Sequence, residues 1–90
     1  MSASRENVPV FNCVVNVAPS DADGGVVATV ANLHGLVGRG RSEREALAQV
    51  VPQFKAAVGR YHQAGEAIPW IDPPAECPAG HAQRLIAVHL

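Results

Sequence analysis

Five polar residues of this 90-residue chain have types and spacing that could do chemistry. They are His34, Arg39, Arg41, Ser42 and Arg44, and four of the five surround the expected start of a helix. Guanidinium groups attract anions, and so do the free N–H groups of a helix N-terminus. The pattern therefore predicts a candidate anion or partner contact. A solvated loop and helix start would use the same residues, and both interpretations stay open.

Nucleophilic and metal chemistry find less support in the sequence. Cys13 lies in an apolar strand pattern, where a cysteine behaves as a small buried hydrophobe. Cys77 and His81 form the one Cys/His pair at ligand-like spacing, and two ligands do not make a structural zinc site. The acidic residues that two-metal hydrolysis would need lie in loops, at Asp21, Asp23, Asp72 and Glu76. We expect no catalytic residues, no metal and no cofactor.

The composition limits the class of partner. The chain has seven basic and eight acidic residues, a net charge of −1, so it lacks the positive excess typical of nucleic-acid binding. We therefore expect no direct DNA binding. The N-terminus has no apolar signal core, and no apolar run reaches membrane-spanning length. These features predict a cytoplasmic protein without membrane contact.

The core is expected to bury little apolar area relative to the surface of the domain. The hydrophobic residues include 15 Ala and 13 Val but only 5 Leu and 3 Ile. Small side chains remove less apolar area from water than large ones do, and a short chain with such a core gains stability by self-association. We expect a homo-oligomer.

The elements that must position these residues follow from periodicity and turn chemistry. Alternating apolar residues predict a strand over 8–17, and further strands are expected over 26–31, 36–39 and 84–90. A turn separates the first two strands at 18–25, where Gly24 and Gly25 supply turn conformations. We expect residues 1–7 to be flexible and the proline-rich segment 66–81 to be irregular. The result is a single α+β domain over 1–90, in the order β-β-β-α-β.

The one long helix has clear start and stop signals. Ser42 is a strong N-cap, and Glu45 three residues later completes a capping box. Gly65 is suited to end the helix. Pro52 interrupts the pattern, and we expect one kinked helix because the apolar stripe keeps its phase across it. That stripe consists of Leu47, Val50, Val51, Phe54, Val58 and Tyr61.

A single helix covers one face of a four-stranded sheet. The opposite face would carry Val10 and Val14 of the first strand, and an apolar face of this kind is unsuited to water. A second copy or a partner protein would cover it.

The same stretch of sequence resembles the HicB-like antitoxin family. The resemblance rests on four short motifs: Leu33-His34-Gly35, Gly40-Arg41-Ser42, Glu45-Ala46 and Gly65-Glu66-Ala67-Ile68-Pro69. Together with the preceding strands it covers residues 8 to about 70. The chain departs from the family pattern at His34, where the family usually has proline, and at Pro52 within the helix.

The resemblance implies a partial ribonuclease-H-like fold without nuclease activity. Family members commonly bind and block a small HicA-type toxin that cleaves messenger RNA, and oligomers are frequent. It therefore favours a non-catalytic protein-binding module in a toxin–antitoxin system, or a diverged relative. The alternative is a small-ligand (anion) binding domain, or an enzyme, that uses the helix start at Ser42 with Arg39 and Arg41.

Overall fold

The computed structural model describes residues 9–20 and 24–90. Four strands and one helix follow in the order β1 (Val10–Pro19), β2 (Val26–Val30), β3 (Val37–Gly40), α2 (Glu43–Ala64) and β4 (Ala82–His89). The predicted α+β order β-β-β-α-β is confirmed. The expected flexible segment 1–7, the first residue of the expected strand 8–17 and the middle of the turn at 21–23 lie outside the described residues.

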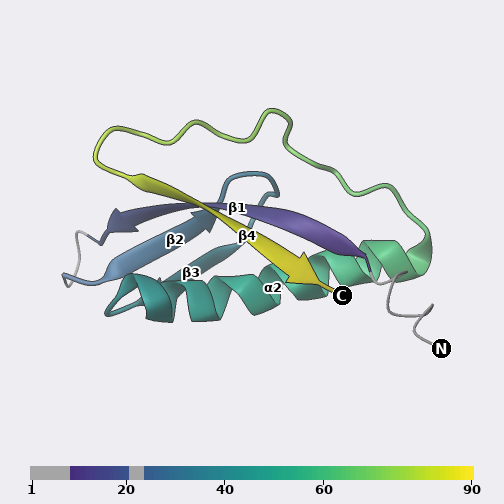
Figure 1. Ribbon diagram of the computed structural model, residues 1–90, viewed down its shortest axis with the longest axis horizontal. Coiled ribbons are helices and arrows are strands. Elements are labelled where there is room, and N and C mark those ends of the chain that lie inside the picture. Colours follow the sequence, from purple (N-terminus) through teal and green to yellow (C-terminus); the bar gives the residue numbers. More distant parts are fainter. Residues whose placement is uncertain (1–8, 21–23) are drawn as a thin grey trace.

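The four strands form one antiparallel sheet in the order β3-β2-β1-β4. β1 is the central long strand: Val15 pairs with Val30 of β2 on one side and with Arg84 of β4 on the other. β4 begins two residues earlier than expected, at Ala82, because Ala82 and Gln83 continue the ladder against Val17 and Asn16. Figure 1 shows α2 running along the sheet. The two edge strands are β3 and β4.

The core lies between α2 and one face of the sheet, the inner face. Cys13, Val15, Ala28 and Val30 point to this face, since side chains alternate along a strand, and all four are buried. From the helix, the buried residues are Ala46, Val50, Phe54, Ala57 and Val58. Leu47, Val51 and Tyr61 of the expected stripe are only half buried. The helix is thus rotated so that Ala46 and Ala57, rather than Leu47, Val51 and Tyr61, complete the buried face.

Two glycines of β3 explain this rotation. A Cβ atom added at Gly38 would meet the Ala46 carbonyl oxygen and would lie 2.8 Å from Val50 N, and one added at Gly40 would lie 2.8 Å from Ala46 N. No side chain fits there, so the helix backbone packs directly on the strand. Of the three glycines that the sequence places near the helix start, only Gly35 has a positive φ, 83°. Gly38 and Gly40 serve packing rather than a turn.

The helix ends are as the sequence predicts, with one difference. The Ser42 hydroxyl accepts from Glu45 N–H at 3.2 Å, and Gly65 ends the helix with φ 69°. The Glu45 carboxylate accepts from Arg41 N–H at 2.9 Å, one residue before the partner that a capping box uses. A single helix continues through the exposed Pro52. Within the described residues, no helix combines the length and apolar character that crossing a bilayer requires.

Asn32 extends the sheet beyond the end of β2. Its side chain is only 8% exposed, accepts from Val14 N–H at 3.1 Å and donates to the Asn12 carbonyl at 2.8 Å. These backbone groups of β1 lie beyond the last pair of the β1–β2 ladder, Val15 and Val30. Leaving such buried groups without a hydrogen bond would lower stability. One amide side chain therefore replaces a further step of the ladder.

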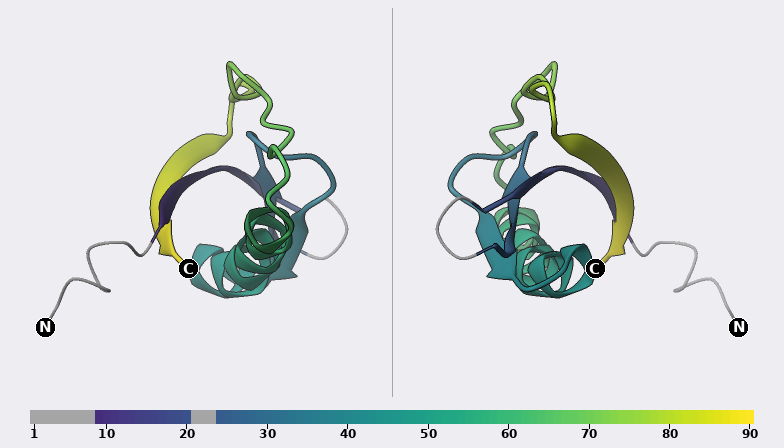
Figure 2. Two further views of the ribbon diagram at one scale, coloured as in Figure 1. Left: turned by 90° about the vertical axis from the view of Figure 1, so that its right-hand side faces the viewer. Right: turned by 90° about the vertical axis from the view of Figure 1, so that its left-hand side faces the viewer.

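The segment 66–81 leaves the C-terminal end of α2 and then passes to the side of the sheet away from α2, as Figure 2 shows. It has no regular structure, as expected. Near its start, the Trp70 ring packs against both Phe11 and Phe54 with centroid separations of 6.0 Å. Ile71 N–H and Ala75 N–H then donate to the Asn32 and Ala31 carbonyls, at 3.0 and 2.9 Å. The aromatic contact and these hydrogen bonds attach an irregular segment to the sheet.

The glycine packing predicts a large cost for one methyl group. Gly38→Ala should lower the free energy of unfolding by about 3 kcal/mol, because the new methyl meets helix backbone rather than movable side chains. The matched control is Gly59→Ala in α2, where an added Cβ meets nothing within 4 Å. That change should raise stability by about 0.5–1 kcal/mol. Urea denaturation measures both, and equal effects would contradict the packing role.

The two hydrogen bonds of the Asn32 side chain, the Asn32 bridge, predict that an Asp at this position lowers the free energy of unfolding in a pH-dependent way. Asn32→Asp keeps the shape but, at pH 7, loses the donor to the Asn12 carbonyl, so stability should fall by about 2 kcal/mol. Protonation of the introduced carboxylate restores a donor, and the deficit relative to the wild type should shrink at pH 3. The exposed Asn12 side chain provides the control, since Asn12→Asp should change stability little at either pH. A deficit that is independent of pH would argue against the bridge.

Candidate protein-binding surface

The outer face of the sheet, on the side away from α2, carries exposed apolar side chains. Val10 is 50% exposed, Val37 39% and Leu85 68%. Leu85 lies directly across from Val14 in the β1–β4 pairing. Asn12, Asn16, Thr29 and Gln83 interrupt this apolar surface with polar groups. The face is therefore mixed, as surfaces that bind other proteins commonly are.

Part of the outer face lies under the segment 66–81. Asn16 Nδ2 donates to the Glu76 carbonyl at 3.2 Å, and Gln83 Nε2 donates to Asn16 Oδ1 at 2.9 Å. Between sheet and segment lies a cavity of about 260 Å³, lined by Asn16, Ala18, Val27, Thr29, Glu76, Pro78 and His81. The segment thus covers the centre of the face, and Val10, Val37 and Leu85 stay exposed on either side of it.

Two of the predicted anion contacts come together. Arg39 at the end of β3 and Arg41 beyond it line one open pocket of about 650 Å³, together with Gly24, Gly25, Glu45 and Gln49 among others. Arg39 N–H donates to Gln49 Oε1 at 3.1 Å. The carboxylate of Glu45 lies in the same pocket and offsets part of the positive charge.

The other three predicted contacts lie elsewhere. The Ser42 hydroxyl is engaged as the helix cap. Arg44 is exposed in the first helical turn but does not line the pocket. His34 lies in the turn before β3, whereas Arg39 and Arg41 lie at and beyond its far end. Anion binding by the two arginines stays a prediction, without the full five-residue cluster.

The cysteines are unpaired and differ in environment. Cys13 is fully buried, and burial raises the pKa of its thiol to about 11, so the sulfur packs as a hydrophobe. Cys77 is exposed in the segment 66–81. Within residues 9–20 and 24–90, no three His, Cys, Asp or Glu side chains converge as a metal site would require.

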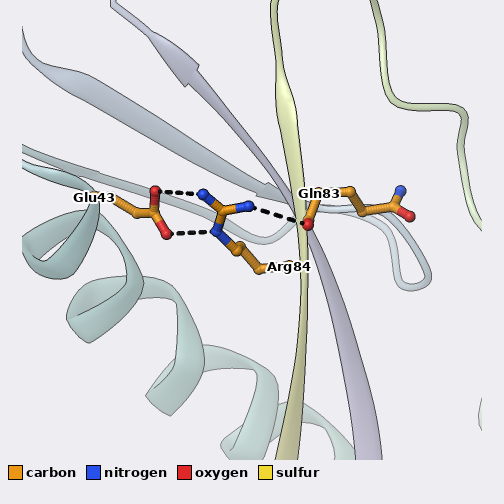
Figure 3. Close-up of polar contacts among 3 residues, drawn as sticks. All are labelled: Glu43, Gln83 and Arg84. Carbon is orange, nitrogen blue, oxygen red and sulfur yellow. Dashed lines mark hydrogen bonds and ion pairs between the residues drawn. The ribbon is translucent and has the colours of Figure 1, made fainter.

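An ion pair joins β4 to the first turn of α2. Arg84 Nε and Nη2 donate to the two carboxylate oxygens of Glu43 at 2.7 and 3.1 Å, and Arg84 Nη1 reaches the Gln83 carbonyl at 3.4 Å (Figure 3). The bidentate hydrogen bond from Arg84 lowers the pKa of the Glu43 carboxyl below its ordinary 4.5. The negative charge also suits the helix N-terminus. The pair holds an edge strand against the helix.

Sequence reasoning missed Arg84 and Asn32. Arg84 occupies an inner-face position of β4, opposite Val15, where the sequence pattern predicts a strand over 84–90 but indicates no role for this residue. A charged residue in such a register can indicate an opposite charge on the facing element, and Glu43 in the first helical turn was the available carboxylate. Asn32 looked like an ordinary turn residue, and only its low exposure distinguishes it.

Comparison with models of protein families gives no match, and comparisons with curated proteins and with solved structures give no significant match either. The HicB-like resemblance of the four motifs therefore stays a prediction.

The Glu43–Arg84 pair predicts a measurable titration. Because the folded pKa of Glu43 lies below its ordinary 4.5, the pair stabilises the fold fully above that value, and the contribution is lost as pH falls through the folded pKa. Arg84→Gln should raise the pKa of the Glu43 carboxyl towards 4.5, as measured by NMR titration. Arg44→Gln, which removes an exposed arginine from the neighbouring position, should leave it unchanged. An unaltered titration in Arg84→Gln would contradict the pair.

Proposed function

We propose that this chain is a non-catalytic protein-binding module of the HicB-like antitoxin type, or a diverged relative, that works as a homo-oligomer in the cytoplasm. The observation that carries the proposal is the outer face of the sheet. Val10 and Val37 are 50% and 39% exposed there, although the chain has few large apolar residues. Exposed apolar groups on a sheet face, surrounded by polar residues, suit a protein partner.

The segment 66–81 supports a surface of stable shape. Its backbone is attached to the turn after β2 through Ile71 and Ala75 and to β1 through Glu76. A partner on the outer face would contact this segment together with the flanking strands. Because both are held in place before binding, little conformational entropy would be lost.

The expected partner follows from the resemblance. A HicA-type toxin is a small basic protein, and this chain has a weak net charge of −1. Shape and apolar contact on the outer face would then contribute more to affinity than long-range charge attraction.

Co-expression with a neighbouring gene's small basic product tests the proposal. The chain should co-purify with that product and relieve its toxicity. Val10→Lys combined with Val37→Lys should weaken the complex by about tenfold or more, since both side chains would leave the interface. Calorimetric titration of the purified pair measures the change.

The matched control adds the same charge elsewhere. Ala56→Lys with Gln63→Lys places two lysines on exposed helix positions, and affinity should stay within a factor of about two. If the outer-face and helix variants bind equally well, the outer face is not the binding surface. If no product of an adjacent gene binds at all, the antitoxin role fails.

A further inference from the structure

The two edges of the sheet differ in how their backbone groups are satisfied. At β3, the outward Arg39 N–H donates to Gln49 Oε1 at 3.1 Å, and the outward Val37 carbonyl accepts from Gln53 Nε2 at 2.9 Å. Two glutamine side chains of α2 thus bind two of the four outward backbone groups of Val37 and Arg39. Capping of this kind keeps an edge strand from pairing with another chain.

Within residues 9–20 and 24–90, no helix side chain caps the β4 edge in this way. Leu90 N–H donates to the Pro9 carbonyl, so even-numbered residues of β4 bond to β1, and odd-numbered residues point their N–H and C=O outward. The outward residues are Gln83, Leu85, Ala87 and His89. Among the described residues, these outward backbone groups make one hydrogen bond, in which Arg84 Nη1 donates to the Gln83 carbonyl at a long 3.4 Å. Figure 2 shows β4 along one margin of the sheet, with α2 and segment 66–81 to its other side.

The side chains of β4 give this edge little protection. Natural edge strands use lysine, proline, bulges, short length or inward-pointing charges to avoid pairing. β4 has eight regular residues, Ala82–His89, with no lysine or proline, and the charge of its inward-pointing Arg84 is neutralised by Glu43. Leu85 in the middle of the strand is 68% exposed, the highest value among the large apolar residues. An edge that is long, regular and apolar at its centre is suited to a further strand.

We propose that β4 pairs with β4 of a second copy, antiparallel about a two-fold axis, and joins two four-stranded sheets into one. A register centred on Ile86 makes all four outward residues complementary. Gln83 would exchange both backbone hydrogen bonds with His89 of the partner subunit, and Leu85 with Ala87 of the partner subunit. On the outer face, Leu85 and Ala87 of both copies then form one apolar cluster across the axis. No like charges stand opposite one another.

On this pairing the assembly stops at two copies, because Gln49 and Gln53 of α2 partly cap the β3 edge. Each subunit uses its β4 edge once, and both margins of the joined sheet are then capped β3 strands. A two-fold interface that uses the same surface on both subunits closes on itself. The inference deepens the proposed function, on which it rests for the expectation of self-association. It assigns the dimer to an edge and leaves the outer face for the partner.

Mass by light scattering tests the pairing on the full chain. The wild type should have twice the 9.4 kDa mass of one chain. Ala87→Pro removes one outward N–H and no internal hydrogen bond, so it should shift the mass to that of one chain. Ala87→Thr, which keeps the N–H and favours strand structure, should remain a dimer. Circular dichroism checks that each variant is folded.

Amide hydrogen exchange provides a second readout that needs no variant. In the dimer, the Leu85 and Ala87 amides should exchange about 100-fold more slowly than free amides, and dilution should restore fast exchange. The Arg84 and Ile86 amides bond to β1 and should stay protected at any concentration.

Three results would overturn the pairing. One is a single-chain mass at all concentrations. Another is a dimer whose Leu85 and Ala87 amides exchange freely, which would place the interface on another surface such as the outer face. The third is protection of these amides only when a different protein is added. If the β4 pairing fails these tests, the co-purification test of the proposed function is unaffected. If co-purification with a neighbouring gene's product fails, the mass and exchange results still test the pairing.

Discussion

The close approach of α2 to β3 is the constraint on which the rest of the structure depends. Gly38 and Gly40 leave no side chain between strand and helix, so the helix lies against the backbone of β3. It therefore covers the β2–β3 half of the sheet more fully than β4. Ala46 is buried at this contact, where a larger side chain would separate the layers. A helix placed off centre in this way leaves β4 to be held by other means.

β4 is held by its backbone ladder with β1, and local contacts supplement the ladder and the small core. Arg84 of β4 reaches Glu43 at the helix start, so that an ion pair supplies contact where the helix supplies little apolar cover. At the far end of β1, the Asn32 amide satisfies two backbone groups beyond the end of β2. Trp70 packs on Phe11 and Phe54 and attaches the segment 66–81. A core of valine and alanine is thus supplemented by a few specific contacts at its margins.

The same placement accounts for the surfaces available to other proteins. With α2 on the inner face and segment 66–81 over the centre of the outer face, exposed apolar side chains remain on both sides of that segment. The helix glutamines that reach the β3 edge can do so because α2 lies so close to that strand. Towards β4, the described polar contact of α2 is the Glu43–Arg84 pair, in which Glu43 binds a side chain and no outward backbone group of the strand. The packing of α2 on β3 therefore makes the β3 edge different from the β4 edge. It also gives the proposed dimer and the proposed protein partner separate surfaces.

The sequence by itself determined the element order, the helix ends at Ser42 and Gly65, and the burial of Cys13, because capping and side-chain alternation act over a few residues. It placed β4 two residues late and assigned no packing role to Gly38 and Gly40. The path of segment 66–81, the bridge at Asn32, the Glu43–Arg84 pair and the separation of His34 from Arg39 were decided only by the tertiary structure. Each depends on which distant residue lies opposite, and strand register and the depth of helix packing set that. Local chemistry shows where a helix begins, but it does not show which backbone lies beneath it.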